Sequence, residues 1–311
     1  MEEKKEMDGG LFKSRSYLSC LNEGLKLPTR HILPLLKFLY PSLIVGAVVM
    51  GLWGVFFNQI TVALTRWIAA SEPVVLSFPL FTLIILSVLS LLADSFYMGN
   101  VMTAVSRFAT AGAWPALRFG EAKREIFNAS LRALTCTLVP VVVFSLLIVP
   151  VTLWLGPGNV WVTVVSYILL LALGVPYCMV IMDYMLGERR DFWYSLKRMK
   201  DGYQYWGAFF IILFCGGLIM GVLAAVSWLP AGILAYAGHA SLMGVLEGDA
   251  TDLPSYVPAL VVFFFMLASV IANVFSWLTL FPLSYLYGSV EARKQEKASF
   301  EEEERRLQGL Q

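Results

Sequence analysis

Long stretches without any charged residue are the feature that most constrains how this chain can fold. Five of them enclose 28, 21, 50, 45 and 38 residues, and they run from Lys37 to Arg66, Glu72 to Asp94, Arg132 to Asp183, Asp201 to Glu247 and Asp252 to Glu291. A helix needs about 20 apolar residues to cross the roughly 30 Å hydrocarbon core of a bilayer. Each stretch can therefore cross at least once, and it must do so as a helix, because lipid offers no partner for unpaired backbone groups.

The composition agrees with this interpretation. Hydrophobic residues make up 58% of the 311 residues and charged residues only 14%, whereas about 25% is usual for charged residues in soluble domains. A soluble domain of this length has too small a core to bury so much apolar surface. An ordinary soluble enzyme, a disordered chain and a disulfide scaffold are excluded, and an all-α, polytopic transmembrane helical bundle is predicted.

The charge-free stretches divide into six predicted spans. The longest stretch contains the sequence GPGN at 156–159, which is a turn signal. The spans are then 38–60, 74–97, 133–155, 160–183, 206–229 and 257–286. Residues 231–246 are apolar but few and follow Pro230, so we expect a re-entrant or surface-lying helix there, with a seventh span as the alternative. Prolines inside the spans, among them Pro140, Pro150 and Pro176, predict bends.

Basic residues predict the orientation of these spans. Of the 23 Lys and Arg residues, all but Arg66 lie in the N-terminal segment, the connections after spans two and four, or the C-terminal tail. Because such residues are retained on the cytoplasmic side, both termini are expected in the cytoplasm and the chain in the cytoplasmic (inner) membrane. The chain is then divided into a cytoplasmic amphipathic segment (1–37), a six-span transmembrane domain (38–290) and a charged cytoplasmic tail (291–311).

A weak threefold repeat is visible along the chain. Spans two, four and six end in the related sequences SFYMG, DYMLG and SYLYG, at 95–99, 183–187 and 284–288. We interpret these as aromatic interface anchors followed by a glycine helix stop. Each odd span follows an amphipathic, basic lead-in, at 11–25, 121–134 and 191–205, which is typical of helices lying at the membrane surface. The predicted unit is a surface helix and two spans, repeated three times in parallel, although any six-span protein has aromatic belts and basic inner loops.

The sequence offers no catalytic chemistry. His31 and His239 are the two histidines, and the predicted topology places them on opposite sides of the membrane. Neither a metal-binding pair nor a nucleophile with its base is present at the required spacing. We therefore expect no catalytic residue, no metal site and no cofactor.

A few polar residues remain as candidates for contact with lipid or substrate. Asp94 and Asp183 lie near the inner ends of spans two and four, where they form either a cytoplasm-facing vestibule or ordinary membrane-boundary positions. Asn273 lies well inside span six, where it either packs across helices or contacts a substrate. The third lead-in also carries a cluster of basic residues suited to anionic headgroups, namely Lys197, Arg198 and Lys200.

Partners are expected to be membrane components. Gly217 and Gly221 in span five, and Ala47 and Gly51 in span one, are spaced as in helices that approach one another closely. This leaves room for a homo-oligomer or a membrane-protein partner as well as for packing within one chain. Membrane lipids with anionic headgroups are expected on the cytoplasmic face, and no nucleic acid is expected.

A family resemblance rests on two features of the sequence. They are the basic lead-ins, at 121–134 and 191–205, and the aromatic-x-x-Gly span ends, at 184–187 and 285–288. The pattern resembles a group of uncharacterised six-span bacterial membrane proteins, and it is similar to the membrane domain attached to some glycerophosphodiester phosphodiesterases. The resemblance covers about residues 11–290, includes no soluble phosphodiesterase domain and transfers no functional residue. The leading hypothesis is a non-enzymatic membrane protein that binds lipid or organises the membrane. The alternative is a transporter or lipid translocator that uses the centre of the bundle.

Overall fold

The computed structural model describes residues 10–70, 77–111, 118–156, 158–246, 248 and 254–308. These residues are overwhelmingly helical, and no strand occurs among them. Six helical segments are long and apolar enough to cross a membrane, namely Ile32–Ile60, Phe81–Ala111, Phe119–Leu155, Val160–Leu186, Trp206–Val245 and Val257–Gln308. The predicted all-α, six-span organisation is confirmed, and the chain is a multi-pass integral membrane protein.

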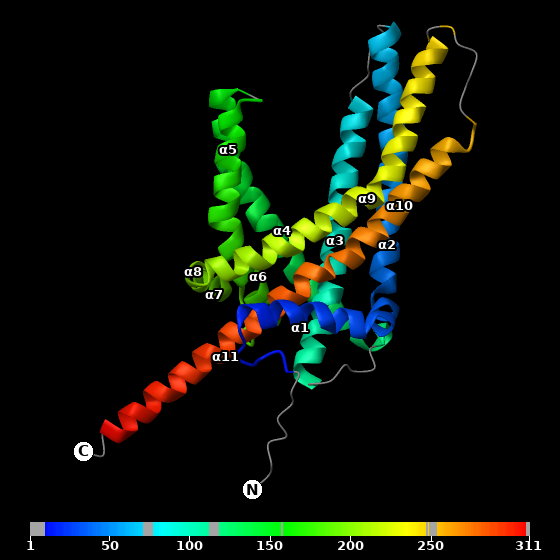
Figure 1. Cartoon of the computed structure of the whole chain (residues 1–311). Helices are drawn as coiled ribbons and strands as arrows, with labels where there is room; N and C mark the ends of the chain where they lie inside the picture. Colours follow the sequence, from blue (N-terminus) through cyan, green and yellow to red (C-terminus); the bar gives the residue numbers. More distant parts are fainter. Residues whose placement is uncertain are drawn as a thin grey trace. The chain divides into compact units, whose positions relative to one another are not determined.

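Figure 1 shows the helices in their order along the chain. Their bounds are α1 Tyr17–Arg30, α2 Ile32–Ala70, α3 Ser77–Ala111, α4 Phe119–Leu155, α5 Val160–Leu169, the π-helical turn η1 Leu170–Gly174, α6 Val175–Leu186, α7 Phe192–Lys197, α8 Met199–Gln204, α9 Trp206–Leu246, α10 Val257–Phe275 and α11 Trp277–Gln308. Predicted span four is thus made of α5, η1 and α6. Predicted span six extends across α10 and the start of α11.

The chain forms two compact units. Unit 1 contains Met1–Phe38, Met98–Gly217 and Trp277–Gln311, and unit 2 contains Leu39–Tyr97 and Leu218–Ser276. Every basic residue except Arg66 belongs to unit 1, so the charge separation seen in the sequence is also a separation between units. The boundaries that we predicted at 37/38 and 290/291 fall inside α2 and α11.

The three lead-ins differ in structure. The first forms α1, which lies along α11 (Figure 1). Cys20 Sγ donates to the Tyr285 carbonyl and Gly24 lies against Pro282, while Leu18 stays exposed. The third forms the short helices α7 and α8 against α6. The second is not a separate helix: it is the first part of α4, which continues into span three because no glycine or proline interrupts residues 121–139.

Each even span nevertheless contacts the lead-in that follows it, and the last even span contacts the first lead-in. The pairs in contact are Gly99 with Ser130, Gly202 with Pro176, and Gly24 with Pro282. In each pair, a Cβ placed on the glycine would lie 2.5–2.8 Å from an atom of the partner residue, which is too close for a side chain. All three contacts lie within unit 1. The three contacts therefore pair each even span with a lead-in, in the same order as the repeated sequences.

The repeated glycines have two different roles. Gly187 follows the last residue of α6 and caps it, as expected of a helix stop. Gly99 and Gly288 instead lie inside α3 and α11, so the predicted helix stop is wrong for them. A Cβ on Gly288 would lie 2.9 Å from the carbonyl carbon of Leu11, which shows that these glycines allow two backbones to approach closely.

Residues 231–246 do not form a separate re-entrant or surface helix, and they do not form a seventh span. They continue α9, a single helix of 41 residues with Pro230 inside it. A proline breaks only one backbone hydrogen bond, and helices in membrane proteins tolerate it where neighbouring groups compensate. Likewise, α4 runs unbroken through Pro140 and Pro150.

Pro176 has a visible effect, because the π-helical turn η1 ends two residues before it. In a π-helix a carbonyl pairs with the N–H five residues later, and for Leu171 that residue is Pro176, which has no N–H. The indole Nε1 of Trp206 donates to the Leu171 carbonyl at 3.1 Å. The first residue of α9 therefore satisfies a backbone group that the proline leaves unpaired.

Candidate functional site

A buried carboxylate, Asp183 at the end of α6, is the centre of a polar cluster in unit 1. Its side chain is 4% exposed. Ser195 Oγ donates to it at 2.7 Å and Tyr287 Oη at 3.0 Å, and Arg198 Nη1 forms an ion pair with it. A charge in such a position is stable only with partners of this kind, because burial alone disfavours the ionised form.

Arg198 connects Asp183 to two further carboxylates. Its Nε donates to Asp201 at 3.1 Å, and its Nη2 pairs with Glu291. Lys294 also pairs with Asp201. The cluster therefore ties α6, the α7–α8 segment and α11 together through three carboxylates and two cations, and the hydroxyl donors to Asp183 offset part of the remaining negative charge.

These contacts shift the ionisation of the residues outside the spans. Burial would lower the pKa of Arg198, but its hydrogen bond to Glu291 and the charge of Asp183 outweigh burial and raise it above the ordinary value. Burial would raise the pKa of Asp201, but hydrogen bonds from Lys294 and Arg198 hold it below its ordinary 3.8. Both groups stay charged at neutral pH. Their ion pairs therefore persist and hold α6, the α7–α8 segment and α11 together.

A polar cavity of about 930 Å³ lies beside this cluster, within unit 1. Asp183, Arg198, Tyr287 and Glu291 line one part of it, and Arg190 lines another. Of the two residues of the predicted vestibule, Asp183 lines this cavity and Asp94 does not. Asp183 does not reach out to headgroups, because its carboxylate is engaged inside the protein.

A second cavity, of about 520 Å³, lies between α3, α4 and the connection that follows α6. We call it the arginine pocket, because Arg107, Arg132 and Arg190 line it. Glu125 is the carboxylate of its lining and holds Arg107 through two hydrogen bonds of 2.9 and 3.1 Å. Arg132 bonds instead to backbone carbonyls, including that of Tyr184 at 3.4 Å.

The three basic residues predicted to contact headgroups do not share one environment. Lys197 and Lys200 are exposed. Arg198 is not: its side chain is 12% exposed and bonds to Asp183, Asp201 and Glu291. The prediction of a lipid contact is therefore wrong for Arg198, because the carboxylates of α6 and α11 hold its guanidinium inside unit 1.

The other two candidates belong to unit 2. Asp94 is exposed on α3. Asn273 lies near the end of α10, where its carbonyl accepts from Tyr97 Oη and, at 2.7 Å, from Ser276 Oγ. A Cβ on Gly46 would lie 3.2 Å from Asn273 Nδ2. This close approach across helices agrees with the packing interpretation of Asn273.

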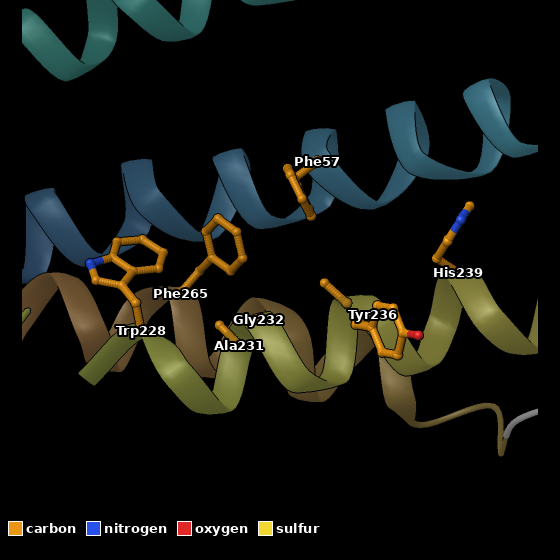
Figure 2. A pocket seen from close by; sticks show the side chains of 8 residues that line it. Phe57, Trp228, Ala231, Gly232, Tyr236, His239 and Phe265 are labelled. Carbon is orange, nitrogen blue, oxygen red and sulfur yellow. The ribbon is translucent and has the colours of Figure 1, made fainter. Parts of the chain in front are cut away.

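Unit 2 has a cavity of its own, of about 450 Å³, between α9, α2 and α10. Figure 2 shows the rings of Trp228 and Phe265 at one end of it and Tyr236 and His239 at the other. Trp228 meets Phe265 edge-on, with 4.9 Å between ring centroids. The lining is mainly aromatic and apolar and includes none of the predicted site residues, which suits contact with acyl chains rather than polar chemistry.

Sequence reasoning did not single out several residues that line the polar cavities. In the sequence, Arg132 and Arg190 are only basic residues of a lead-in and a connection, and Tyr287 and Glu291 are only parts of a span end and the tail. A local signal existed for Tyr287, which belongs to the third repeated span end. No local signal existed for Glu291, because its partner Arg198 lies 93 residues earlier.

Comparison of the chain with known protein families, with curated proteins and with solved structures found no match. The resemblance to membrane domains of glycerophosphodiester phosphodiesterases stays a prediction.

Proposed function

We propose that this chain is a non-enzymatic protein of the cytoplasmic membrane that binds anionic phospholipids on its basic face, with both termini in the cytoplasm. The observation that carries the proposal is the surface of the α7–α8 segment. There Lys197 and Lys200 are exposed beside Trp193, which is 70% exposed, and Tyr203, which is 50% exposed. Lysines beside exposed aromatic rings suit the headgroup level, where rings meet the interface and ammonium groups meet lipid phosphates.

The decisive experiment measures lipid selectivity in a bilayer. The protein is reconstituted in phosphatidylcholine with spin-labelled phosphatidylglycerol or phosphatidylcholine, and the motionally restricted fraction is compared by electron paramagnetic resonance. Each lysine near the surface contributes about 1 kcal/mol toward anionic lipid. We therefore expect the wild type to select phosphatidylglycerol, the variant K197Q/K200Q to lose much of that selectivity, and high salt to reduce it in both.

A matched control removes the same charge elsewhere. Lys297 and Arg305 are exposed near the end of α11, so K297Q/R305Q should retain the wild-type selectivity. Equal loss in both double variants would show only an effect of net charge. That result, or unchanged selectivity in K197Q/K200Q, contradicts the proposal.

The polar cavity at Asp183 favours a second candidate, a lipid translocator. Its volume of about 930 Å³ and its polar lining suit a headgroup during passage. In proteoliposomes with a fluorescent headgroup-labelled lipid, a translocator would let dithionite bleach well beyond the outer leaflet, and D183N would reduce the rate. Bleaching limited to the outer leaflet, as in protein-free vesicles, rejects this candidate.

A further inference from the structure

The arginine pocket contains more positive charge than its own side chains neutralise. Of the three arginines that line it, Arg107 is paired with Glu125. Arg132 and Arg190 have no carboxylate among their hydrogen-bond or salt-bridge partners in the described part of the chain. Two guanidinium groups that share a pocket repel one another, and a bound anion would remove that cost.

Arg132 is positioned so that part of its guanidinium stays free. Its Nε donates to the carbonyl of Asn128 at 3.3 Å, and its Nη1 reaches the carbonyls of Tyr184 and Met185 at 3.4 and 3.5 Å. These bonds fix the group at the end of α6 and leave Nη2 outside this set of bonds. A guanidinium that is held in place while one edge stays available is suited to a planar, bidentate acceptor such as phosphate.

Arg190 reaches the same pocket from an unusual backbone conformation. Its φ is +49°, and no other described non-glycine residue has a positive φ. Its side chain is exposed, and its charge acts on both Arg132 and Glu125. A non-glycine residue in this conformation is strained, and such strain persists where the surroundings favour it, often at ligand sites.

The remaining lining completes an anion site. The hydroxyl of Ser106 lines the pocket and donates none of the hydrogen bonds described above, whereas those of Thr103 and Thr110 donate to backbone carbonyls at 2.8 and 2.9 Å. Met102 and Met185 add apolar walls. Charged donors, one available hydroxyl and apolar walls together match a phosphate group attached to an apolar molecule.

We propose that the arginine pocket binds a phosphate group through Arg132 and Arg190, with Ser106 as an additional donor. This inference deepens the proposed function and rests on it where the source of the phosphate is a lipid. An anionic phospholipid headgroup and a free phosphate ion offer the same chemistry, and they are separated by experiment.

The test uses the purified full-length protein in mild detergent. Native mass spectrometry measures binding of phosphatidic acid and phosphatidylcholine to the wild type, to R190Q and to R124Q. Arg124 is exposed on the same helix as Arg132 and does not line the pocket, so R124Q is the matched control. We expect one preferred phosphatidic acid site that R190Q weakens roughly tenfold, as expected for a lost charge-assisted contact, and that R124Q leaves within about twofold.

Two further measurements exclude trivial explanations. Thermal unfolding shows whether each variant is folded, and R132K, which keeps the charge but not the planar fork, should also weaken binding. Inorganic phosphate added at millimolar concentration identifies the source: displacement of the lipid assigns the pocket to free phosphate, and persistence of the lipid assigns it to a headgroup. Wild-type affinity in folded R190Q and R132K would overturn the inference.

The same experiment separates this inference from the proposed function. Unchanged binding in R190Q, together with lost bilayer selectivity in K197Q/K200Q, refutes the pocket and leaves the proposed function standing. Lost binding in R190Q, together with unchanged selectivity in K197Q/K200Q, supports the pocket and refutes the α7–α8 surface as the lipid contact.

Discussion

Removing Arg198 is the most informative perturbation of this protein. Replacement by glutamine takes away the cation that joins Asp183, Asp201 and Glu291. Lys294 still neutralises Asp201, but Asp183 is left with only the hydroxyl groups of the cluster. We predict that R198Q destabilises the protein strongly, although local sequence properties alone do not distinguish Arg198 from its exposed neighbours.

The magnitude follows from the burial of the partners. The side chains of Asp183 and Arg198 are 4% and 12% exposed, so their interaction is only weakly screened by water. Breaking a buried ion pair by removing one partner costs about 3–5 kcal/mol, because the other charge is left without compensation. The neighbouring change K197Q affects an exposed side chain and should cost less than about 0.5 kcal/mol.

The assay is reversible unfolding in mixed detergent micelles with increasing dodecyl sulfate, followed by circular dichroism and tryptophan fluorescence. D183N and R198Q/D183N complete a double-mutant cycle. Because the double variant no longer contains the stranded carboxylate, it should be more stable than the sum of the single changes predicts, by about 1–3 kcal/mol. Additive single effects, or R198Q as stable as K197Q, would refute the reasoning.

Three further predictions use other contacts of unit 1. The pKa of Asp201 is held below 3.8. Its pairing with Lys294 therefore stabilises the protein above that pH, and this stabilisation is lost as the pH falls through the folded pKa. The Tm difference between wild type and D201N should shrink below about pH 4. G202A, whose Cβ would lie 2.8 Å from a Cα of α6, should cost about 1–3 kcal/mol in the same unfolding assay, while G207A, with open space around it, should be neutral or stabilising by up to about 1 kcal/mol. W206F removes the indole donor to the carbonyl beside the π-helical turn and should cost about 1 kcal/mol, which a control substitution at an exposed tryptophan should not.

The helix ends could be predicted less well than the spans. Hydropathy locates a span because each residue contributes to the free energy of transfer into lipid independently of its neighbours in space. Whether a lead-in separates from its span depends on local breaks. The second lead-in has none and merges with α4, whereas α1 and α2 separate at His31. Pro230 predicts a break, and this prediction is wrong because α9 continues through it.

The candidate site shows a similar limit. Asp183 could be singled out because it is a rare charge at the end of a span. Its partners could not all be foreseen: Ser195 and Arg198 are near in sequence, but Tyr287 comes from another helix, 104 residues away. The arginine pocket likewise joins α3, α4 and the connection after α6, and nothing local marks Arg132 and Arg190 as neighbours.

The sequence by itself determined that the chain crosses a membrane six times and that its basic residues are segregated from most of its apolar length. Both follow from the free-energy cost of placing charge in hydrocarbon, because that cost depends only on the residues of each segment. Only the tertiary structure decided that Lys197 and Lys200 face outward while the side chain of Arg198 is largely withdrawn from solvent. That outcome depends on carboxylates supplied by α6 and α11, and only the packing of these helices brings them within reach of one guanidinium group.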